Sequence, residues 1–177
     1  ERVCQWLNNP KKVFPILIEL SLNNICNNRC IFCALDYCRK PIKGKNLEFS
    51  LLKKLMPELS ALGIKSIFIA GTGEPTLHPN FIEIIKLIKK NNIDVALNTN
   101  MLAYSKEKIE MTLEYLSWIR ISINAATPKI YSKIHNCAEK NFEKVIENII
   151  TAVKYKKDKK LNTTIGPQIV LIDDNIS

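Results

Sequence analysis

Three closely spaced cysteines are the residues of this sequence best suited to chemistry. They lie in the stretch CNNRCIFC as Cys26-x3-Cys30-x2-Cys33, with Phe32 directly before the last of them. Thiolates ligate zinc and iron–sulfur clusters, so the stretch predicts a metal centre. A zinc site would need a fourth ligand, for which Cys38 is a candidate, whereas a 4Fe–4S cluster held by three cysteines keeps one iron open. Both interpretations remain open at this point.

The composition indicates one globular domain in a reducing compartment. The chain has 177 residues, of which 46% are hydrophobic and 24% charged, which is ordinary for a folded domain. The proline-broken start is not a signal peptide, and no apolar run is long enough to span a membrane. We therefore expect a cytoplasmic protein whose six cysteines are ligands or free thiols rather than disulfides. The isolated Cys4 and Cys137 are predicted to be small buried hydrophobic residues.

The net charge of +9 is spread over many lysines, with one dense run, KYKKDKK, at 154–160. Cations suit the end of a solvated helix, where they oppose the helix dipole. Aromatic residues do not alternate with these lysines, as they would in a nucleic-acid groove. The charge therefore does not predict nucleic-acid binding.

Strand-like and helix-like segments alternate along the chain, which predicts an α/β fold of parallel strands joined by right-handed crossovers. Either a doubly wound sheet or a full or partial β/α barrel fits, and in both the reactive groups lie at the carboxyl ends of the strands. Pro57 is expected to kink or break its helix, and Asn80 to cap the next. The last strand, apolar at nearly every position, is predicted to be buried on both faces. Strands are expected at 14–22, 64–71, 93–98, 117–125 and 163–173, and helices at 50–63, 80–91, 105–116, 127–135 and 141–157.

Polar and glycine-rich sequences follow four of the predicted strands. The cysteine stretch follows the first, GTGEPTLHP (71–79) the second, NTNM (98–101) the third, and SINAAT (122–127) ends the fourth. Taken singly, such residues are commonly turn formers or helix caps. Because all four sequences fall at the same predicted edge of the sheet, they predict a functional site there.

Two of these sequences resemble the signature of the radical SAM superfamily. The first is Cys26-x3-Cys30-x-Phe32-Cys33 after strand one, and the second is GTGEP after strand two, where that family has a glycine–glycine–glutamate motif. The similarity extends from about Phe14 to about Asp173. It implies an open partial (β/α) barrel with five of an expected six strand–helix units. The domain would occupy residues 1–177, of which 1–13 precede the first strand. The C-terminal part of the core is expected beyond residue 177.

The resemblance also implies roles for single residues. The three cysteines would hold a 4Fe–4S cluster whose open iron binds the amino and carboxylate groups of S-adenosylmethionine. The sequence departs from the family at Thr72, where a glycine is usual, and at Asn124, where an acidic residue is common. Where an arginine often stands it has His135, which would either contact the cofactor or be structural, and His78 is expected to shape its loop. The implied cofactor contacts are Phe32 at the adenine, Thr72, Gly73 and Glu74 at the methionine amino group, Ser122 and Asn124 at the carboxylate and ribose, and Asn98 nearby.

The implied activity is reductive cleavage of S-adenosylmethionine to methionine and a 5′-deoxyadenosyl radical. That radical would abstract hydrogen from an unidentified substrate, either a peptide or protein or a small molecule. An external one-electron reductant, such as flavodoxin or ferredoxin, would be the partner. The alternative function is a non-catalytic iron–sulfur or zinc module that serves as scaffold or electron carrier.

Overall fold

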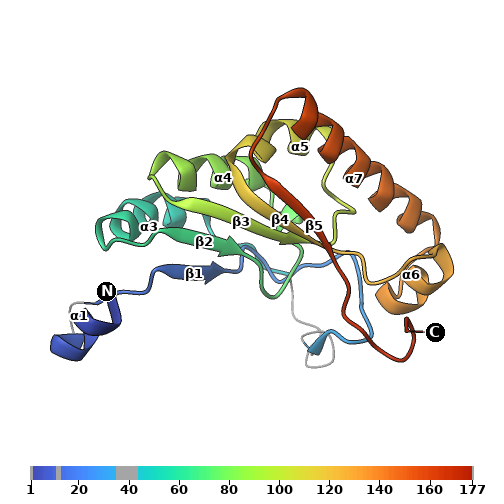
Figure 1. The fold of residues 1–177 in the computed structure, drawn as a ribbon, viewed down its shortest axis with the longest axis horizontal. Helices are drawn as coiled ribbons and strands as arrows, with labels where there is room; N and C mark the ends of the chain where they lie inside the picture. The colour runs from blue at the N-terminus through green and yellow to red at the C-terminus, as the bar shows by residue number, and fades with distance from the viewer. Residues whose placement is uncertain (1, 11–12, 35–43, 177) are drawn as a thin grey trace.

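The chain folds around a five-stranded parallel sheet with the order β1-β2-β3-β4-β5 (Figure 1). The computed structural model describes residues 2–10, 13–34 and 44–176. Every strand pairs with the next one in sequence, so right-handed crossovers place the connecting helices on the same face. This is the winding of a β/α barrel that is left open, which confirms the expected fold. The strands are β1 (Leu17–Leu20), β2 (Ser66–Ile69), β3 (Asp94–Thr99), β4 (Leu116–Ser122) and β5 (Thr164–Gln168).

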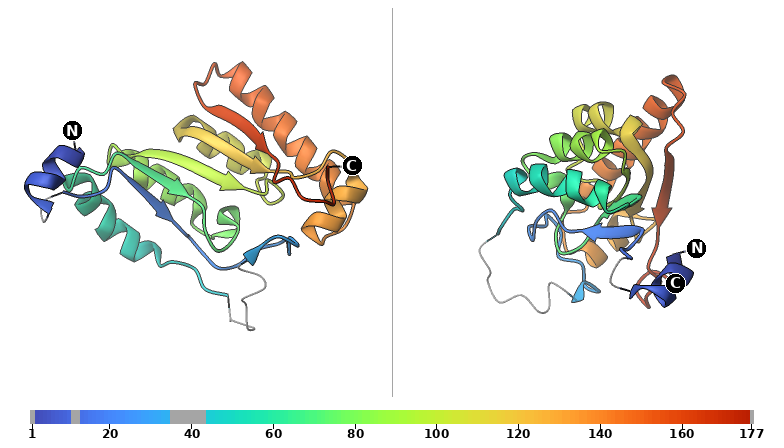
Figure 2. Two further views of the ribbon diagram at one scale, coloured as in Figure 1. Left: turned by 60° about the horizontal axis from the view of Figure 1, so that its bottom comes forward. Right: turned by 90° about the vertical axis from the view of Figure 1, so that its left-hand side faces the viewer.

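Four helices cover one face of the sheet (Figure 2): α3 (Phe49–Ala61), α4 (Phe81–Lys90), α5 (Lys106–Thr112) and α7 (Lys140–Asp158). Alternate strand residues point into this layer, because successive side chains of a strand face opposite sides. None of these four helices lies over the other face, where half-buried side chains occur on β2 and β4. The large buried side chains that the strands direct into this layer include Ile67, Ile69, Val95, Leu97, Ile119 and Ile121; burying each such side chain contributes about 1.5–3 kcal/mol.

The helix α6 (Pro128–His135) lies at the carboxyl end of the sheet (Figure 1). It begins as predicted, since the Thr127 hydroxyl accepts a hydrogen bond from the Ile130 N–H and Pro128 occupies the first turn. It ends at Asn136, which adopts a left-handed conformation with φ 47°. The helix α3 ends just before Gly63, whose φ of 82° is the left-handed conformation that commonly follows a helix.

Several boundary predictions are wrong or only partly confirmed. The helix α3 continues through Pro57, which lies on its exposed side, where a missing backbone hydrogen bond leaves no buried carbonyl unpaired. The helix predicted at 105–116 ends at Thr112, and a 3-10 turn, η3 (Leu113–Tyr115), precedes β4. Asn80 stands at the cap of α4, but its side chain makes no capping hydrogen bond.

The strand β5 is shorter and more exposed than expected. It ends at Gln168 rather than near residue 173, and none of its residues is fully buried. It pairs only with β4 and so forms an edge of the described sheet. The apolar residues that follow it are open to solvent, with Leu171 73% exposed.

The N-terminal helix α1 (Arg2–Asn8) was not expected from the sequence. The Arg2 guanidinium anchors it by donating hydrogen bonds to the carbonyls of Phe14, Pro15 and Gly63. Its Cys4 is exposed, contrary to prediction, and Cys137 is half-buried. No helix in the described part of the chain is long and apolar enough to cross a membrane.

Candidate functional site

A pocket of about 170 Å³ lies at the carboxyl ends of β2, β3 and β4. It collects nearly all the site residues predicted from sequence; Thr72 is the exception. It also contains residues that the sequence analysis did not single out, among them Asn28, Thr99 and Asn100. The lining residues are Cys26, Asn28, Cys30, Phe32, Cys33, Ala70, Gly71, Gly73, Glu74, Asn98, Thr99, Asn100, Ser122, Asn124 and His135.

The cysteine-bearing loop is attached through its backbone to the end of α6. The Arg29 N–H donates to the His135 carbonyl at 3.0 Å, and the Ile31 N–H donates to the Ile134 carbonyl at 2.9 Å. The last carbonyls of a helix have no partner within the helix and must find one elsewhere. The loop supplies those donors, so the position of α6 fixes the position of the cysteines.

His135 connects the loop to β4 through its ring. The side chain is fully buried, and its Nε2 lies 3.0 Å from the Ile123 carbonyl, to which it donates. The other nitrogen, Nδ1, then carries the lone pair, and it lies 3.1 Å from Cys30 Sγ and 3.3 Å from Asn28 Nδ2. Burial lowers the pKa of His135, and the Tyr131 ring stacks on it at 4.2 Å. Both nitrogens face protein atoms, which favours the structural role over a direct cofactor contact.

The three thiols influence one another across the pocket. Burial, together with negative charge on Cys26 and Cys33, raises the pKa of Cys30 to about 12. As thiolates the three would repel, so a positively charged group between them would stabilise the site. The metal must displace the proton from each ligand thiol when it binds.

Three thiols in one pocket can serve as the ligands of an iron–sulfur cluster. In residues 2–10, 13–34 and 44–176, no group of three or more His, Cys, Asp or Glu side chains converges on one metal ion. The ligands of a zinc ion all bind the same atom, whereas each cysteine of a 4Fe–4S cluster binds a different iron. Three thiols that line one pocket are compatible with such a cluster. Cys38, the candidate fourth zinc ligand, lies outside the described residues.

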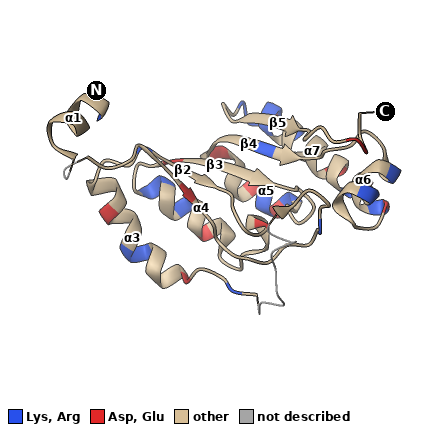
Figure 3. Ribbon diagram, turned by 90° about the horizontal axis from the view of Figure 1, so that it is seen from below, with Lys and Arg blue, Asp and Glu red and all other residues tan. Residues whose placement is uncertain are grey.

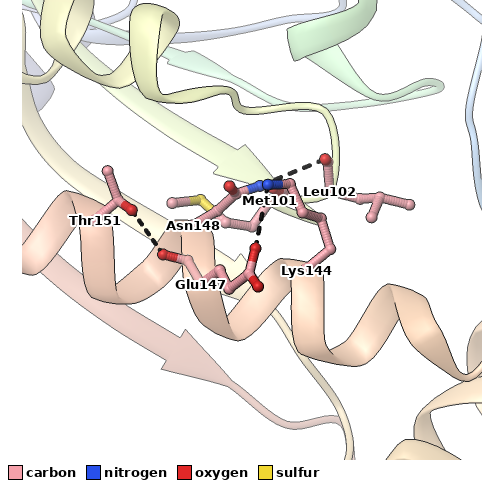
Figure 4. Close-up of polar contacts among 6 residues, drawn as sticks. All are labelled: Met101, Leu102, Lys144, Glu147, Asn148 and Thr151. Carbon is pink, nitrogen blue, oxygen red and sulfur yellow. Dashed lines mark hydrogen bonds and ion pairs between the residues drawn. The ribbon is translucent and has the colours of Figure 1, made fainter.

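The loop after β3 contacts the cysteine loop through Asn100. Its Nδ2 donates to Asn27 Oδ1 at 2.6 Å and lies 3.9 Å from Cys26 Sγ. The helix α7 holds this loop from behind: the buried Asn148 amide donates to the carbonyls of Met101, at 2.9 Å, and Leu102, at 3.5 Å (Figure 4). The sequence did not indicate this contact, because an asparagine such as Asn148 is ordinary on the polar side of a predicted amphipathic helix.

The Glu74 carboxylate joins the loops after β2 and β3. It is buried; its Oε1 accepts hydrogen bonds from the N–H and hydroxyl of Thr76 and from the Thr99 hydroxyl, and its Oε2 accepts one from the Asn100 N–H. Burial raises the pKa of Glu74, and these donors oppose that rise. With its carboxylate occupied in this way, Glu74 organises the rim of the pocket, and its side chain caps the short turn η2 (Pro75–Leu77).

The glycine-rich turn after β2 packs directly against the start of the cysteine loop. Gly71 has φ 103°, so it supplies the left-handed conformation that Thr72 could not adopt cheaply. The Thr72 hydroxyl instead donates to the Asn23 carbonyl at 2.9 Å, which places it outside the pocket lining. At Gly73 a Cβ atom would lie 2.1 Å from Asn23 Oδ1 and 2.6 Å from the Ile25 carbonyl oxygen. Only glycine allows this close approach.

Ser122 and Asn124 both reach the pocket, although they do not do so as alternate residues of one strand. The strand β4 ends at Ser122, and Asn124 has φ 55°, so alternation along a strand does not apply to the pair. Asn124 Oδ1 accepts from the Val170 N–H at 2.9 Å. Its Nδ2 is buried and has no hydrogen-bond partner among the described residues. Ser122 Oγ lies 3.5 Å from Asn98 Oδ1. His78 shapes its loop as expected, with Nδ1 accepting from the Asn80 N–H.

Residues 20–173 match the family described as the Radical SAM superfamily. The chain belongs to this superfamily. The cofactors of a radical SAM protein are a 4Fe–4S cluster and S-adenosylmethionine, and the pocket has the thiols and polar groups to receive them.

Known proteins are similar to this chain in sequence and in structure. A probable GTP 3',8-cyclase of Thermococcus kodakarensis is 32% identical over 148 residues, which cover 84% of this chain and 47% of that protein. An S-adenosylmethionine-dependent nucleotide dehydratase of Flammeovirga pacifica is 30% identical, covering 79% and 50%. The crystal structure of Streptococcus suis SuiB bound to S-adenosylmethionine superposes with a TM-score of 0.63 at 16% identity, covering 98% and 45%. The chain thus spans about half the length of the curated relatives.

Proposed function

We propose that this chain forms the cofactor-binding core of a radical SAM enzyme that cleaves S-adenosylmethionine and uses the product to abstract hydrogen from a substrate. One observation carries the proposal: three thiols and the polar ends of β2, β3 and β4 line a single pocket. Residues 1–177 would be this core domain, with 1–13 leading into it. We further propose that it works in the cytoplasm.

Different pocket residues would bind the cluster and S-adenosylmethionine. Cys26, Cys30 and Cys33 would hold the cluster, and Phe32 would lie against the adenine. When bound, the cluster and S-adenosylmethionine supply one-electron cleavage of the sulfonium to methionine and a 5′-deoxyadenosyl radical. An external one-electron reductant, such as flavodoxin or ferredoxin, would provide the electron.

Asn124 is the strongest candidate for a direct contact with the carboxylate or ribose of S-adenosylmethionine. Its buried Nδ2 has no acceptor in the described part of the chain, and such a donor costs about 1–3 kcal/mol. A ligand oxygen in the pocket would remove that cost. Asn98 and Ser122 line the same wall and offer an amide and a hydroxyl, and the backbone of Gly73 would contact the methionine amino group.

The test is anaerobic reconstitution with iron and sulfide, followed by reduction and chromatographic detection of 5′-deoxyadenosine. We expect the product from the parent protein and from Cys137→Ala, and none from Cys30→Ala. Iron binding without any 5′-deoxyadenosine would instead support the electron-carrier or scaffold alternative. Stoichiometric zinc with no iron would overturn the cluster assignment itself.

A further inference from the structure

An arginine lies on the face of the sheet that the helices leave uncovered. Arg120 is the one Lys or Arg of β4, whose ribbon carries a single blue segment in Figure 3. It follows the same alternation as Trp118 and Ser122, whereas the buried Ile119 and Ile121 point into the helical layer. Arg120 is therefore directed to the inside of the open barrel.

Two aromatic rings and one amide hold the guanidinium in place. Its Cζ lies 5.1 Å from the centre of the Phe68 ring and 6.0 Å from that of Trp118, within the range of cation–π contacts. Its Nε donates to Asn98 Oδ1 at 3.1 Å. The side chain is half-buried, so both its orientation and its partial desolvation are set by the fold.

The charge of Arg120 has no anionic partner in residues 2–10, 13–34 and 44–176, and its Nε bond is the one side-chain hydrogen bond it makes there. Two strand carboxylates share this face. Asp94 is at the opposite end of β3 and pairs with Lys89 at 2.8 Å. Glu19 is on β1, three strand spacings or about 14 Å away. The two Nη groups of Arg120 remain available as a planar fork of donors, the geometry that binds phosphate or carboxylate through two hydrogen bonds.

The fork lies beside the cofactor pocket. Asn98 accepts from Arg120 and also lines that pocket, next to Ser122. An anion on Arg120 would place the rest of its molecule close to the site of radical formation. This step rests on the proposed function, because it concerns the substrate of the same site.

We propose that Arg120 binds a phosphate group of a nucleotide substrate. Phosphate matches the charge and the fork, and a flat base has aromatic surfaces nearby in Phe68 and Trp118, whose rings are 5.0 Å apart. The names of two sequence relatives, a GTP 3',8-cyclase and a nucleotide dehydratase, agree with this class of substrate. An acidic peptide would offer carboxylates to the same fork and is the competing ligand to test.

The experiment uses Trp118 as a local reporter. The chain has two tryptophans, so Trp6→Phe leaves Trp118 as the single emitter. The cluster-loaded protein, with S-adenosylmethionine present, is titrated with GTP, with guanosine and with an acidic peptide. We expect GTP to change the emission saturably, and guanosine and the peptide to have little effect.

Variants then assign the effect to the guanidinium. Arg120→Gln removes the charge and should weaken GTP binding about tenfold or more, because it removes charge-assisted hydrogen bonds. Arg120→Lys keeps the charge without the fork; it should show an intermediate loss and serves as the test if the Gln variant does not fold. Lys65→Gln makes the same change of charge at an exposed residue and should bind normally.

The proposal is overturned if GTP does not bind, if it binds Arg120→Gln as tightly as the parent, or if the acidic peptide binds through Arg120 in its place. Formation of 5′-deoxyadenosine by the parent protein is measured in parallel. Cleavage without nucleotide binding refutes this inference and leaves the proposed function standing. Nucleotide binding through Arg120 without cleavage of S-adenosylmethionine supports the phosphate site and refutes the proposed function.

Discussion

Substituting Gly73 with alanine should both destabilise the protein and disturb the cysteine loop. The added Cβ would lie 2.1 Å from Asn23 Oδ1, 2.6 Å from the Ile25 carbonyl oxygen and 2.7 Å from the Asn23 carbonyl oxygen. Two of these three atoms belong to the backbone, so a side-chain rotation cannot relieve the contact. Overpacking of this kind typically costs about 1–3 kcal/mol.

The displacement should also break hydrogen bonds that join the two loops. The Glu74 N–H donates to the Ile25 carbonyl at 2.7 Å, and Asn23 Nδ2 donates to the Glu74 carbonyl at 3.0 Å. Each is worth about 1 kcal/mol, so the total loss in the free energy of unfolding at Gly73→Ala is about 3–5 kcal/mol.

Urea unfolding followed by circular dichroism measures this loss, and iron content after reconstitution reports on the loop. Gly166→Ala is the matched control, because no atom lies within 4 Å of the added Cβ. It should be neutral or stabilising by up to about 1 kcal/mol, since alanine restricts the unfolded chain. If the free energy of unfolding of Gly73→Ala lies within about 0.5 kcal/mol of that of Gly166→Ala, and both bind the same amount of iron, then Gly73 is not needed for the close approach of the two loops.

Three further predictions concern the pocket. Cys30→Ala should lose the iron and sulfide of the reconstituted protein, as measured by colorimetric assay, whereas Cys137→Ala should keep them; equal loss in both would contradict the ligand assignment. Glu74→Gln replaces Glu74 Oε2, which accepts a hydrogen bond from the Asn100 N–H, with an amide donor, so it should lower the free energy of unfolding by about 1–3 kcal/mol. The control is Glu58→Gln at the exposed glutamate of α3, and an equal change in both variants would refute the prediction. Ser122→Ala should weaken S-adenosylmethionine binding by about 1 kcal/mol in calorimetry, with iron unchanged and with the exposed Ser117→Ala as control; unaltered affinity would remove Ser122 from the site.

The sequence was sufficient to predict the parts of the fold that depend on local sequence patterns. Alternation of strand and helix predicted the parallel sheet, and the family resemblance predicted the open barrel. The caps at Thr127 and Gly63 follow from the chemistry of those residues alone. The three cysteines and the residues after β2, β3 and β4 were placed at one edge because parallel strands end on the same side.

What the sequence could not show depends on contacts between distant segments. The helix α1 is too short to be recognised by periodicity and is attached by Arg2 to carbonyls far along the chain. The burial of His135 and its contacts with Ile123 and Cys30 require α6, β4 and the cysteine loop together. The left-handed turn at Asn124 had no signal, since asparagine is also common at strand ends.

The attachment of the cysteine loop to α6 bears on which sequences the loop can accept. The two bonds come from the N–H groups of residues 29 and 31, which every amino acid except proline possesses. A library randomised at these two positions should therefore retain the iron-binding phenotype across polar, charged and apolar residues and exclude proline. Residues 29 and 31 can then vary widely in sequence while the cysteines stay in register, because at these two positions the loop is held by its main chain.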